Sequence, residues 1–286
     1  MDTIDGKKIA QKIINELKSQ PAPKKFLAAI LVGENPASIN FLKQKEKAAQ
    51  ELGIDFRIYR FTEDIKNDEL RKEVLKIALL KKVGGVIVQL PLPEEINKHY
   101  ILNVIPREKD VDVIGERALG AFYADRNPIL PPAVGVVEEI VHATNYMLHT
   151  TKVAVMGLGF LIGKPITNWL MKEASEIYLL HRGSDFEILK QADLVISGTG
   201  KAGLIKLEML KDGAGVIDFG YAVDENGKIR GDFDASQLSK SPVNQLPNSP
   251  INQLPNFYTP TPGGTGPILV AKLFENFYSL CLHQKS

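Results

Sequence analysis

Short apolar segments alternate with amphipathic segments along most of this chain. The clearest candidates for buried strands are 26–32, 85–90, 152–156, 194–197 and 215–219. Between such segments, apolar residues recur at helical spacing, as they do in 9–17, 70–80 and 162–173. Strands that are apolar on both faces belong to parallel sheets, which helices cover on each side. The alternation therefore predicts an α/β fold built on parallel sheets.

The alternation occurs in two series, and this predicts two domains. The first series starts near the N-terminus and the second starts at Lys152, with a helix expected over 134–143 between them. A length of 286 residues suits one large domain or two modest ones. A last helix is expected over about 266–282, directly after a cluster of proline and glycine.

Composition and charge exclude several classes of partner. Lys and Arg number 35 against 34 Asp and Glu, so no overall charge attracts nucleic acid or an anionic membrane. The apolar segment 26–32 is too short to span a bilayer, and the first six residues lack the pattern of a signal peptide. Cys281 is the single cysteine, which fits a reducing compartment. We expect a cytoplasmic protein without nucleic-acid or membrane partners, and the sequence contains no metal-ligand cluster.

A glycine-rich turn follows the strand expected over 152–156. It reads Gly157-Leu-Gly159-Phe-Leu-Ile-Gly163 and stands directly before a helix. Glycines let a backbone approach a pyrophosphate closely, and a helix N-terminus offers free N–H groups to it. The spacing is one residue longer than the usual dinucleotide fingerprint. The context favours dinucleotide binding over a plain turn.

The end of the next expected strand indicates which dinucleotide is bound. It reads Leu180-His181-Arg182-Gly-Ser184, without the acidic residue that usually binds the ribose of NAD. Arg182 and Ser184 are suitable donors to a 2′-phosphate, although Asp185 follows closely and Arg182 could instead be solvated. The pattern favours NADP over NAD.

Lys45 stands among apolar residues on a helix that is expected to start at the Asn35-Pro36 turn and to end near Leu52. A lysine that faces inward is desolvated, which lowers its pKa and suits it to proton transfer. The alternative is a lysine whose stem packs while its ammonium reaches water. Helix geometry alone leaves both interpretations open.

Three further polar or glycine-rich features lie near the ends of expected strands or helices. Gln89 is the polar residue at the end of the strand over 85–90, where open α/β sheets bind ligands, although an amide there can also satisfy loop backbone. Asp110 and Asp112 share one side if their segment is extended, although a solvated acidic loop is the usual explanation. Pro262-Gly-Gly264 suggests backbone packed against a flat ligand, or a rigid turn.

Residues 241–256 contain a tandem repeat, in which Ser-Pro-Val-Asn-Gln-Leu-Pro-Asn is followed by Ser-Pro-Ile-Asn-Gln-Leu-Pro-Asn. Four prolines exclude a helix and disfavour a central strand. Two copies are too few for a solenoid. We expect an exposed, mobile loop that was lengthened by duplication.

Taken together, these motifs resemble the bifunctional methylenetetrahydrofolate dehydrogenase/cyclohydrolase family. They occur in order along nearly the whole chain. The motifs are Ile4-Asp-Gly-Lys-Lys-Ile9, Val32-Gly-Glu-Asn-Pro-Ala-Ser38, Lys45-Glu-Lys47, Val88-Gln-Leu-Pro-Leu-Pro93, Lys109-Asp-Val-Asp112, Gly157 to Pro165, Asn226-Gly-Lys228, Gly231-Asp232 and Thr261-Pro-Gly-Gly-Thr-Gly-Pro267.

The resemblance implies a tetrahydrofolate-binding catalytic domain of residues 1–125, completed by about 260–286. A Rossmann-type NAD(P)-binding domain is expected over 126–259, with the repeat at 241–256 as a loop, and two chains are expected to form a homodimer. The implied activity is the NADP-dependent oxidation of 5,10-methylenetetrahydrofolate to 5,10-methenyltetrahydrofolate, then hydrolysis to 10-formyltetrahydrofolate. These reactions belong to one-carbon metabolism and serve purine biosynthesis.

The resemblance also implies roles for particular residues. Lys45 is expected to be catalytic, Gln89 to assist it and Asp112 to hold the pterin. Folate contacts are expected from Phe41, Pro262, Gly263 and Gly264. Cofactor contacts are expected from Gly157, Leu158, Gly159, Gly163, His181, Arg182, Ser184, Thr199 and Tyr221.

Several positions depart from the family pattern. The usual tyrosine four residues before the catalytic lysine is Phe41, and the usual glycine after Asp112 is Val113. The usual Pro-Cys-Thr-Pro segment is Pro-Pro-Ala-Val at 131–134, Gly159 replaces a common serine, and Thr265 replaces a common valine. Two alternatives follow: a catalytically impaired folate- or nucleotide-binding protein, and a dehydrogenase of the same fold for another small substrate.

Overall fold

The computed structural model describes residues 2–224, 227–238 and 256–283, which form two compact units. The first, called here the three-stranded unit, takes in 10–132 and the chain from 270 onward. The second, the six-stranded unit, takes in the chain up to residue 9 and 133–269. All of the repeat at 241–256 except Asn256 lies outside the described residues.

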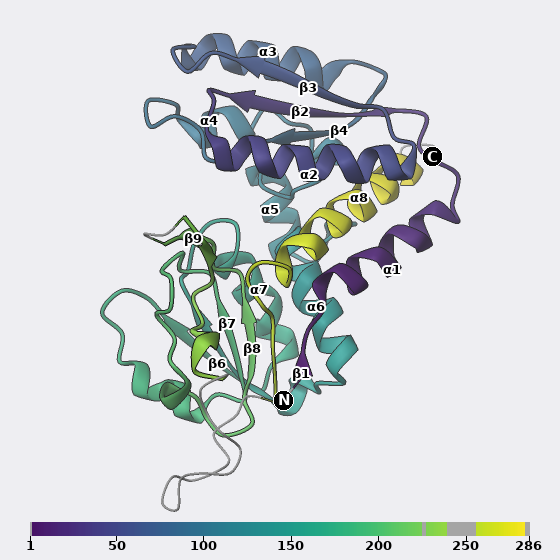
Figure 1. The fold of residues 1–286 in the computed structure, drawn as a ribbon. Helices are drawn as coiled ribbons and strands as arrows, with labels where there is room; N and C mark the ends of the chain where they lie inside the picture. The colour runs from purple at the N-terminus through teal and green to yellow at the C-terminus, as the bar shows by residue number, and fades with distance from the viewer. Residues whose placement is uncertain (1, 225–226, 239–255, 284–286) are drawn as a thin grey trace, which may run out of the picture. The chain divides into compact units, whose positions relative to one another are not determined.

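The three-stranded unit is built on a parallel sheet with the order β3-β2-β4 (Figure 1). Its strands are β2 (Phe26–Val32), β3 (Phe56–Phe61) and β4 (Val83–Val88). Its helices are α2 (Pro36–Leu52), α3 (Asn67–Leu79), α4 (Lys98–Leu102), α5 (Glu116–Tyr123) and the 3-10 helix η1 (Arg107–Lys109). Every residue of β2 is buried, so this sheet is covered on both faces as its apolar sequence predicts.

Helix α2 starts and ends where its sequence indicates. The Asn35 side chain accepts a hydrogen bond from the Ser38 backbone N–H at 3.0 Å, and Pro36 occupies the first turn, where no N–H partner is lost. At the other end, Gly53 adopts a left-handed conformation with a φ of 66°. The expected helix that carries Lys45 is confirmed.

The six-stranded unit contains a parallel sheet with the order β1-β11-β8-β7-β5-β6. The strands are β1 (Asp2–Thr3), β5 (Lys152–Met156), β6 (Glu176–Leu180), β7 (Leu194–Ser197), β8 (Gly215–Asp218) and β11 (Phe257–Tyr258). A hairpin of β9 (Ala222–Val223) and β10 (Ile229–Arg230) follows β8. This parallel sheet confirms the predicted Rossmann-type architecture.

Helices complete this unit and connect it to the other. Within it lie α7 (Gly163–Glu173) and the 3-10 helices η2 (Leu148–Thr150), η3 (Phe186–Gln191), η4 (Leu207–Met209) and η5 (Ala235–Gln237). Three helices run from one unit into the other: α1 (Gly6–Lys18), α6 (Pro132–Thr144) and α8 (Thr265–His283). Among the described residues, none of the helices has the length and apolar character to span a membrane.

Candidate active site and nucleotide site

Lys45 and Gln89 meet in the three-stranded unit. Lys45 lies on α2, and its Nζ donates a hydrogen bond to Oε1 of Gln89 at 3.1 Å. Gln89, which follows β4, is itself fixed, because its backbone N–H donates to the Ile30 carbonyl at 2.9 Å and its Nε2 donates to the Leu90 carbonyl at 2.8 Å. The amide of Gln89 therefore satisfies loop backbone and also presents its oxygen to the lysine.

Asp112 interacts electrostatically with Lys45. Burial lowers the pKa of the Lys45 ammonium, and the negative charge of Asp112 partly opposes this. Burial likewise raises the pKa of Asp112, and the charge of Lys45 opposes that shift. A lysine whose pKa is lowered by burial holds its proton less tightly, which suits it to proton transfer. The structure thus favours the inward-facing interpretation of Lys45.

The turn that carries Asp112 is held from two sides. Oδ2 of the buried Asp110 accepts hydrogen bonds from the backbone N–H groups of Ile114 at 3.0 Å and Gly115 at 2.8 Å. From α8, Nδ2 of Asn276 donates to the Val111 carbonyl at 2.9 Å. The usual explanation of these aspartates as a solvated acidic loop is wrong, because Asp110 folds inward to bond the turn that follows it.

The sequence alone does not indicate that Asp110 and Asn276 support the site. For Asp110, the one signal in the sequence is its alternation with Asp112, and this does not show which of the two carboxylates is buried. Asn276 is an amide within a largely apolar helix, and its partner Val111 is 165 residues away. Val113 sits in the same turn with a φ of 53°, a conformation that a β-branched residue rarely adopts.

The buried Asp110 leads to a prediction about pH. Burial, reinforced by the charge of Asp112, raises the pKa of Asp110 from 3.8 to about 7. The folded state therefore binds the Asp110 proton more tightly than the unfolded state does. This proton contributes on the order of 4 kcal/mol to the free energy of unfolding at low pH, and the contribution is lost as pH rises from about 4 to about 7. Asp110→Asn keeps an oxygen for the two N–H groups and removes the ionisation.

We expect Asp110→Asn to gain stability relative to the unmodified protein as pH rises through that window. Urea unfolding of both proteins at several pH values between about 4 and 8 measures the difference. A difference that does not vary with pH would contradict the raised pKa of Asp110.

The predicted dinucleotide turn lies at the carboxyl end of β5. Gly157 has a φ of 83°, and a Cβ built on it would lie 2.8 Å from the Gly198 carbonyl oxygen. A Cβ on Gly163 would lie 2.1 Å from the carbonyl oxygen of Gly157. Nothing lies within 4 Å of a Cβ built on Gly159. The turn is therefore packed against protein backbone at Gly157 and Gly163, whereas Gly159 has free space beside it. Because α7 starts at Gly163, the turn ends on a helix N-terminus.

The segment after β6 forms a compact turn. The His181 backbone N–H donates to Ser184 Oγ at 3.0 Å, and the Ser184 N–H donates to the His181 carbonyl at 3.1 Å. The side chain of Arg182 is exposed. Oδ1 of Asp185 accepts from the Glu187 N–H at 3.0 Å at the start of η3, so this carboxylate is used as a helix cap. The turn therefore presents a cation and a hydroxyl.

The remaining predicted residues divide between the units. Phe41 lies on α2 one turn before Lys45 and is half-buried. Thr199 and Tyr221 follow β7 and β8, at the same sheet edge as the glycine turn. Pro262, Gly263 and Gly264 form the turn before α8 in the six-stranded unit, where the Gly264 N–H donates to the Pro260 carbonyl at 2.8 Å.

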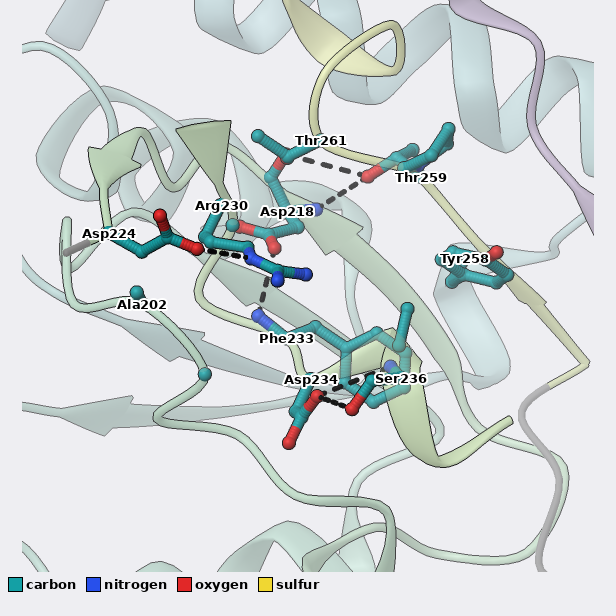
Figure 2. Close-up of a pocket in the computed structure, with 14 residues that line it drawn as sticks. Ala202, Asp218, Asp224, Arg230, Phe233, Asp234, Ser236, Tyr258, Thr259 and Thr261 are labelled. Atoms are coloured by element: carbon teal, nitrogen blue, oxygen red, sulfur yellow. Dashed lines mark hydrogen bonds and ion pairs between the residues drawn. The ribbon is translucent and has the colours of Figure 1, made fainter. Parts of the chain in front are cut away.

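A cavity of about 360 Å³ lies beside the end of β8 (Figure 2). Its charged groups pair with neighbours: Asp224 accepts from Nε of Arg230 at 3.0 Å, and Asp234 accepts from Oγ of Ser236 at 2.6 Å and from Nζ of Lys206 at 2.9 Å. The residues predicted to bind folate or dinucleotide are not among those that line it. We assign this cavity no ligand.

Two family models together match most of the chain. The family model for the tetrahydrofolate dehydrogenase/cyclohydrolase catalytic domain matches residues 4–112, and the model for the NAD(P)-binding domain of the same enzymes matches 131–285. The bifunctional protein FolD of Staphylococcus carnosus is 31% identical over 281 residues, covering 96% of this chain and 94% of that protein.

Solved structures are similar over the full length. The bifunctional FolD methylenetetrahydrofolate dehydrogenase/cyclohydrolase of Campylobacter jejuni superposes with a TM-score of 0.90 at 32% identity, covering 99% of each chain. The Trypanosoma brucei enzyme, solved with NADP cofactor and inhibitor, gives a TM-score of 0.89 at 25% identity, covering 99% of this chain and 98% of that one.

Proposed function

This chain belongs to the tetrahydrofolate dehydrogenase/cyclohydrolase family, and we propose that Lys45, Gln89 and Asp112 perform the family's chemistry in it. The protein oxidises 5,10-methylenetetrahydrofolate to 5,10-methenyltetrahydrofolate with NADP⁺ and hydrolyses the product to 10-formyltetrahydrofolate, as part of one-carbon metabolism. The observation that carries the assignment of residues is the 3.1 Å hydrogen bond between Lys45 and Gln89 beside the charge of Asp112.

The hydrolytic step requires proton transfers. Water adds to the methenyl carbon and loses a proton. As the bond from that carbon to the ring nitrogen breaks, the hydroxyl loses its second proton to give the formyl group and the nitrogen gains one, so one proton is released overall. Lys45 suits these transfers, because burial lowers its pKa and weakens its hold on the proton that it exchanges. Gln89 Oε1 orients the Lys45 amine through its hydrogen bond, and the negative charge of Asp112 stabilises the protonated form of Lys45.

The six-stranded unit fits a dinucleotide. Gly157 and Gly163 leave no room for side chains beneath the turn, and the start of α7 offers free N–H groups to a pyrophosphate. When bound, NADP⁺ supplies the hydride acceptor. Arg182 and Ser184 are proposed to bind its 2′-phosphate, with Leu158, Gly159, His181, Thr199 and Tyr221 as further contacts.

Cofactor choice provides a test of Arg182. A guanidinium that donates to the 2′-phosphate stabilises only NADP⁺. We expect Arg182→Ala to raise the KM for NADP⁺ by roughly tenfold or more, which corresponds to about 1.4 kcal/mol, and to change the KM for NAD⁺ little. Steady-state kinetics with each cofactor measures both values. An equal effect on the two would remove Arg182 from the phosphate site.

One assay tests the function as a whole. The purified protein is mixed with methylenetetrahydrofolate and NADP⁺ or NAD⁺, and reduced cofactor and the methenyl compound are followed. Turnover of folate with NADP⁺ supports the proposal. Tight folate binding without either reaction would indicate an impaired binding protein, and turnover of a different substrate would indicate a related dehydrogenase.

Several finer features are also proposed. The folate-binding catalytic domain spans 1–125 and about 260–286, with contacts from Phe41, Pro262, Gly263 and Gly264, and the NAD(P)-binding domain spans 126–259. The protein acts as a cytoplasmic homodimer and supplies formyl groups for purine biosynthesis. The order of motifs and the single cysteine support these features.

A further inference from the structure

Two buried aspartates interlock at the carboxyl end of β8. Asp218 ends that strand and Asp232 follows β10, and both side chains are almost completely buried. A Cβ built on Gly231 would lie 2.1 Å from Oδ2 of Asp218, and one built on Gly220 would lie 2.3 Å from Oδ1 of Asp232. Each carboxylate therefore fills the space beside a glycine from the other segment.

Asp232 binds the loop that follows β7. Its Oδ2 accepts from Oγ of Ser197 at 2.6 Å and from the Thr199 backbone N–H at 2.7 Å. Its Oδ1 accepts from the Lys201 backbone N–H at 2.8 Å. A buried carboxylate is costly unless donors surround it, and here all three donors come from residues 197–201.

The same loop supports the glycine turn. The Gly198 carbonyl oxygen would lie 2.8 Å from a Cβ on Gly157, and the side chain of Ile162 would lie 2.7 Å from a Cβ on Gly198. The loop backbone is therefore in direct contact with both ends of the segment between β5 and α7. A shift of the loop toward Gly157 or away from it therefore changes the backbone surface on which the glycine-rich turn packs.

Asp218 serves a different segment. Its Oδ1 accepts from the Gly220 N–H at 2.6 Å. Its Oδ2 accepts from the Phe233 N–H at 2.9 Å (Figure 2). Burial, together with the negative charge of Asp232, raises the pKa of Asp218 to about 6. Asp218 thus joins the β9–β10 hairpin to β8, whereas the carboxylate of Asp232 reaches the 197–201 loop.

We propose that Asp232 is a positioning residue of the dinucleotide site, whose carboxylate holds residues 198–201 against the glycine turn before the cofactor binds. The proposal rests on the proposed function, because it takes Gly157, Gly163 and Thr199 as parts of the NADP site. It adds a residue that does not touch the cofactor and acts through backbone hydrogen bonds.

Asp232→Asn tests the proposal with little change in volume. An asparagine presents an NH₂ group in place of one carboxylate oxygen, so a donor faces a donor at the N–H of either Thr199 or Lys201. We expect the Kd for NADP⁺, measured by fluorescence titration well below the melting temperature, to rise at least about tenfold, or 1.4 kcal/mol. Cyclohydrolase activity without cofactor should persist, because Lys45 and Gln89 lie in the other unit.

Two matched variants separate positioning from a general loss of stability. Ser197→Ala removes a buried hydrogen bond to the same carboxylate and leaves both loop N–H groups bonded. Asp234→Asn changes a carboxylate two residues away, which bonds Lys206 and Ser236 instead. Both variants should bind NADP⁺ within about twofold of the unmodified protein. An equal loss of affinity in Ser197→Ala, or normal affinity in Asp232→Asn, would overturn the proposal.

Hydrogen exchange provides a second measurement that needs no variant. If Asp232 holds the loop in advance, the amides of Thr199 and Lys201 exchange slowly in the protein without NADP⁺. Exchange as fast as in an exposed loop would contradict the proposal. If the unmodified protein does not bind NADP⁺ at all, the proposed function fails, and this outcome is distinct from either result with Asp232→Asn.

Discussion

Lys45→Met is expected to lower the cyclohydrolase rate by about 10²- to 10⁴-fold, the range that a general acid or base contributes. Methionine retains most of the apolar stem and removes the amine that bonds Gln89 at 3.1 Å. The fold and the binding of NADP⁺ should persist, because the dinucleotide turn belongs to the six-stranded unit. Hydrolysis of methenyltetrahydrofolate, followed by its absorbance, measures the loss.

Lys43→Met is the matched control for this variant. Lys43 is on the same helix, and its side chain is exposed. The same substitution there should leave the hydrolysis rate within about twofold, because no buried amine is removed. If Lys45→Met hydrolyses substrate as fast as Lys43→Met, Lys45 does not transfer the proton.

Gly163→Ala is expected to weaken both the fold and the dinucleotide site. The added Cβ would lie 2.1 Å from the Gly157 carbonyl oxygen and 2.9 Å from Leu158 Cα, both of which are backbone atoms. Because the backbone must shift, we expect a loss of about 1–3 kcal/mol in the free energy of unfolding. The Kd for NADP⁺ should rise at least about tenfold, since the turn and the start of α7 move apart.

Gly120→Ala provides the comparison. Gly120 lies inside α5, and a Cβ built there has no atom within 4 Å. Alanine in a helix interior should raise stability by roughly 0.5–1 kcal/mol. Denaturant unfolding and NADP⁺ titration of both variants test the contrast. A Gly163→Ala protein as stable and as tightly binding as Gly120→Ala would show that the turn is looser than the structure indicates.

The elements were predictable where the signal is local. The apolar segment 26–32 is a strand with those bounds, and the Asn35-Pro36 turn starts α2 as expected. Strand and helix ends shifted by a few residues elsewhere: the strand predicted to include Gln89 ends at Val88, and α3 begins at Asn67 rather than Leu70. Backbone preference and capping act over a few residues, so they can be read from a single segment.

The contacts of the site are harder to predict from the sequence. Helix geometry placed Lys45 among apolar residues but could not choose between burial and solvation, because the deciding partner, Gln89, is 44 residues away. Asp232 shows the same limit, since its bonds to 197–201 depend on how β10 lies relative to β7. The roles of these residues were indicated by family motifs, whereas their partners required the folded chain.

Each unit of this protein combines two separate stretches of the chain, and this has a consequence for synthesis on the ribosome. Within the three-stranded unit, a Cβ on Gly84 or Gly85 would lie 3.0 Å from the ring of Phe277 in α8, and Asn276 bonds Val111 across 165 residues. Most of that unit, residues 10–132, is therefore synthesised before the main part of the other unit, but the helix that completes it is made last. A nascent chain that has not yet reached residue 270 lacks the helix that covers β4, and we expect it to be a substrate for ribosome-associated chaperones.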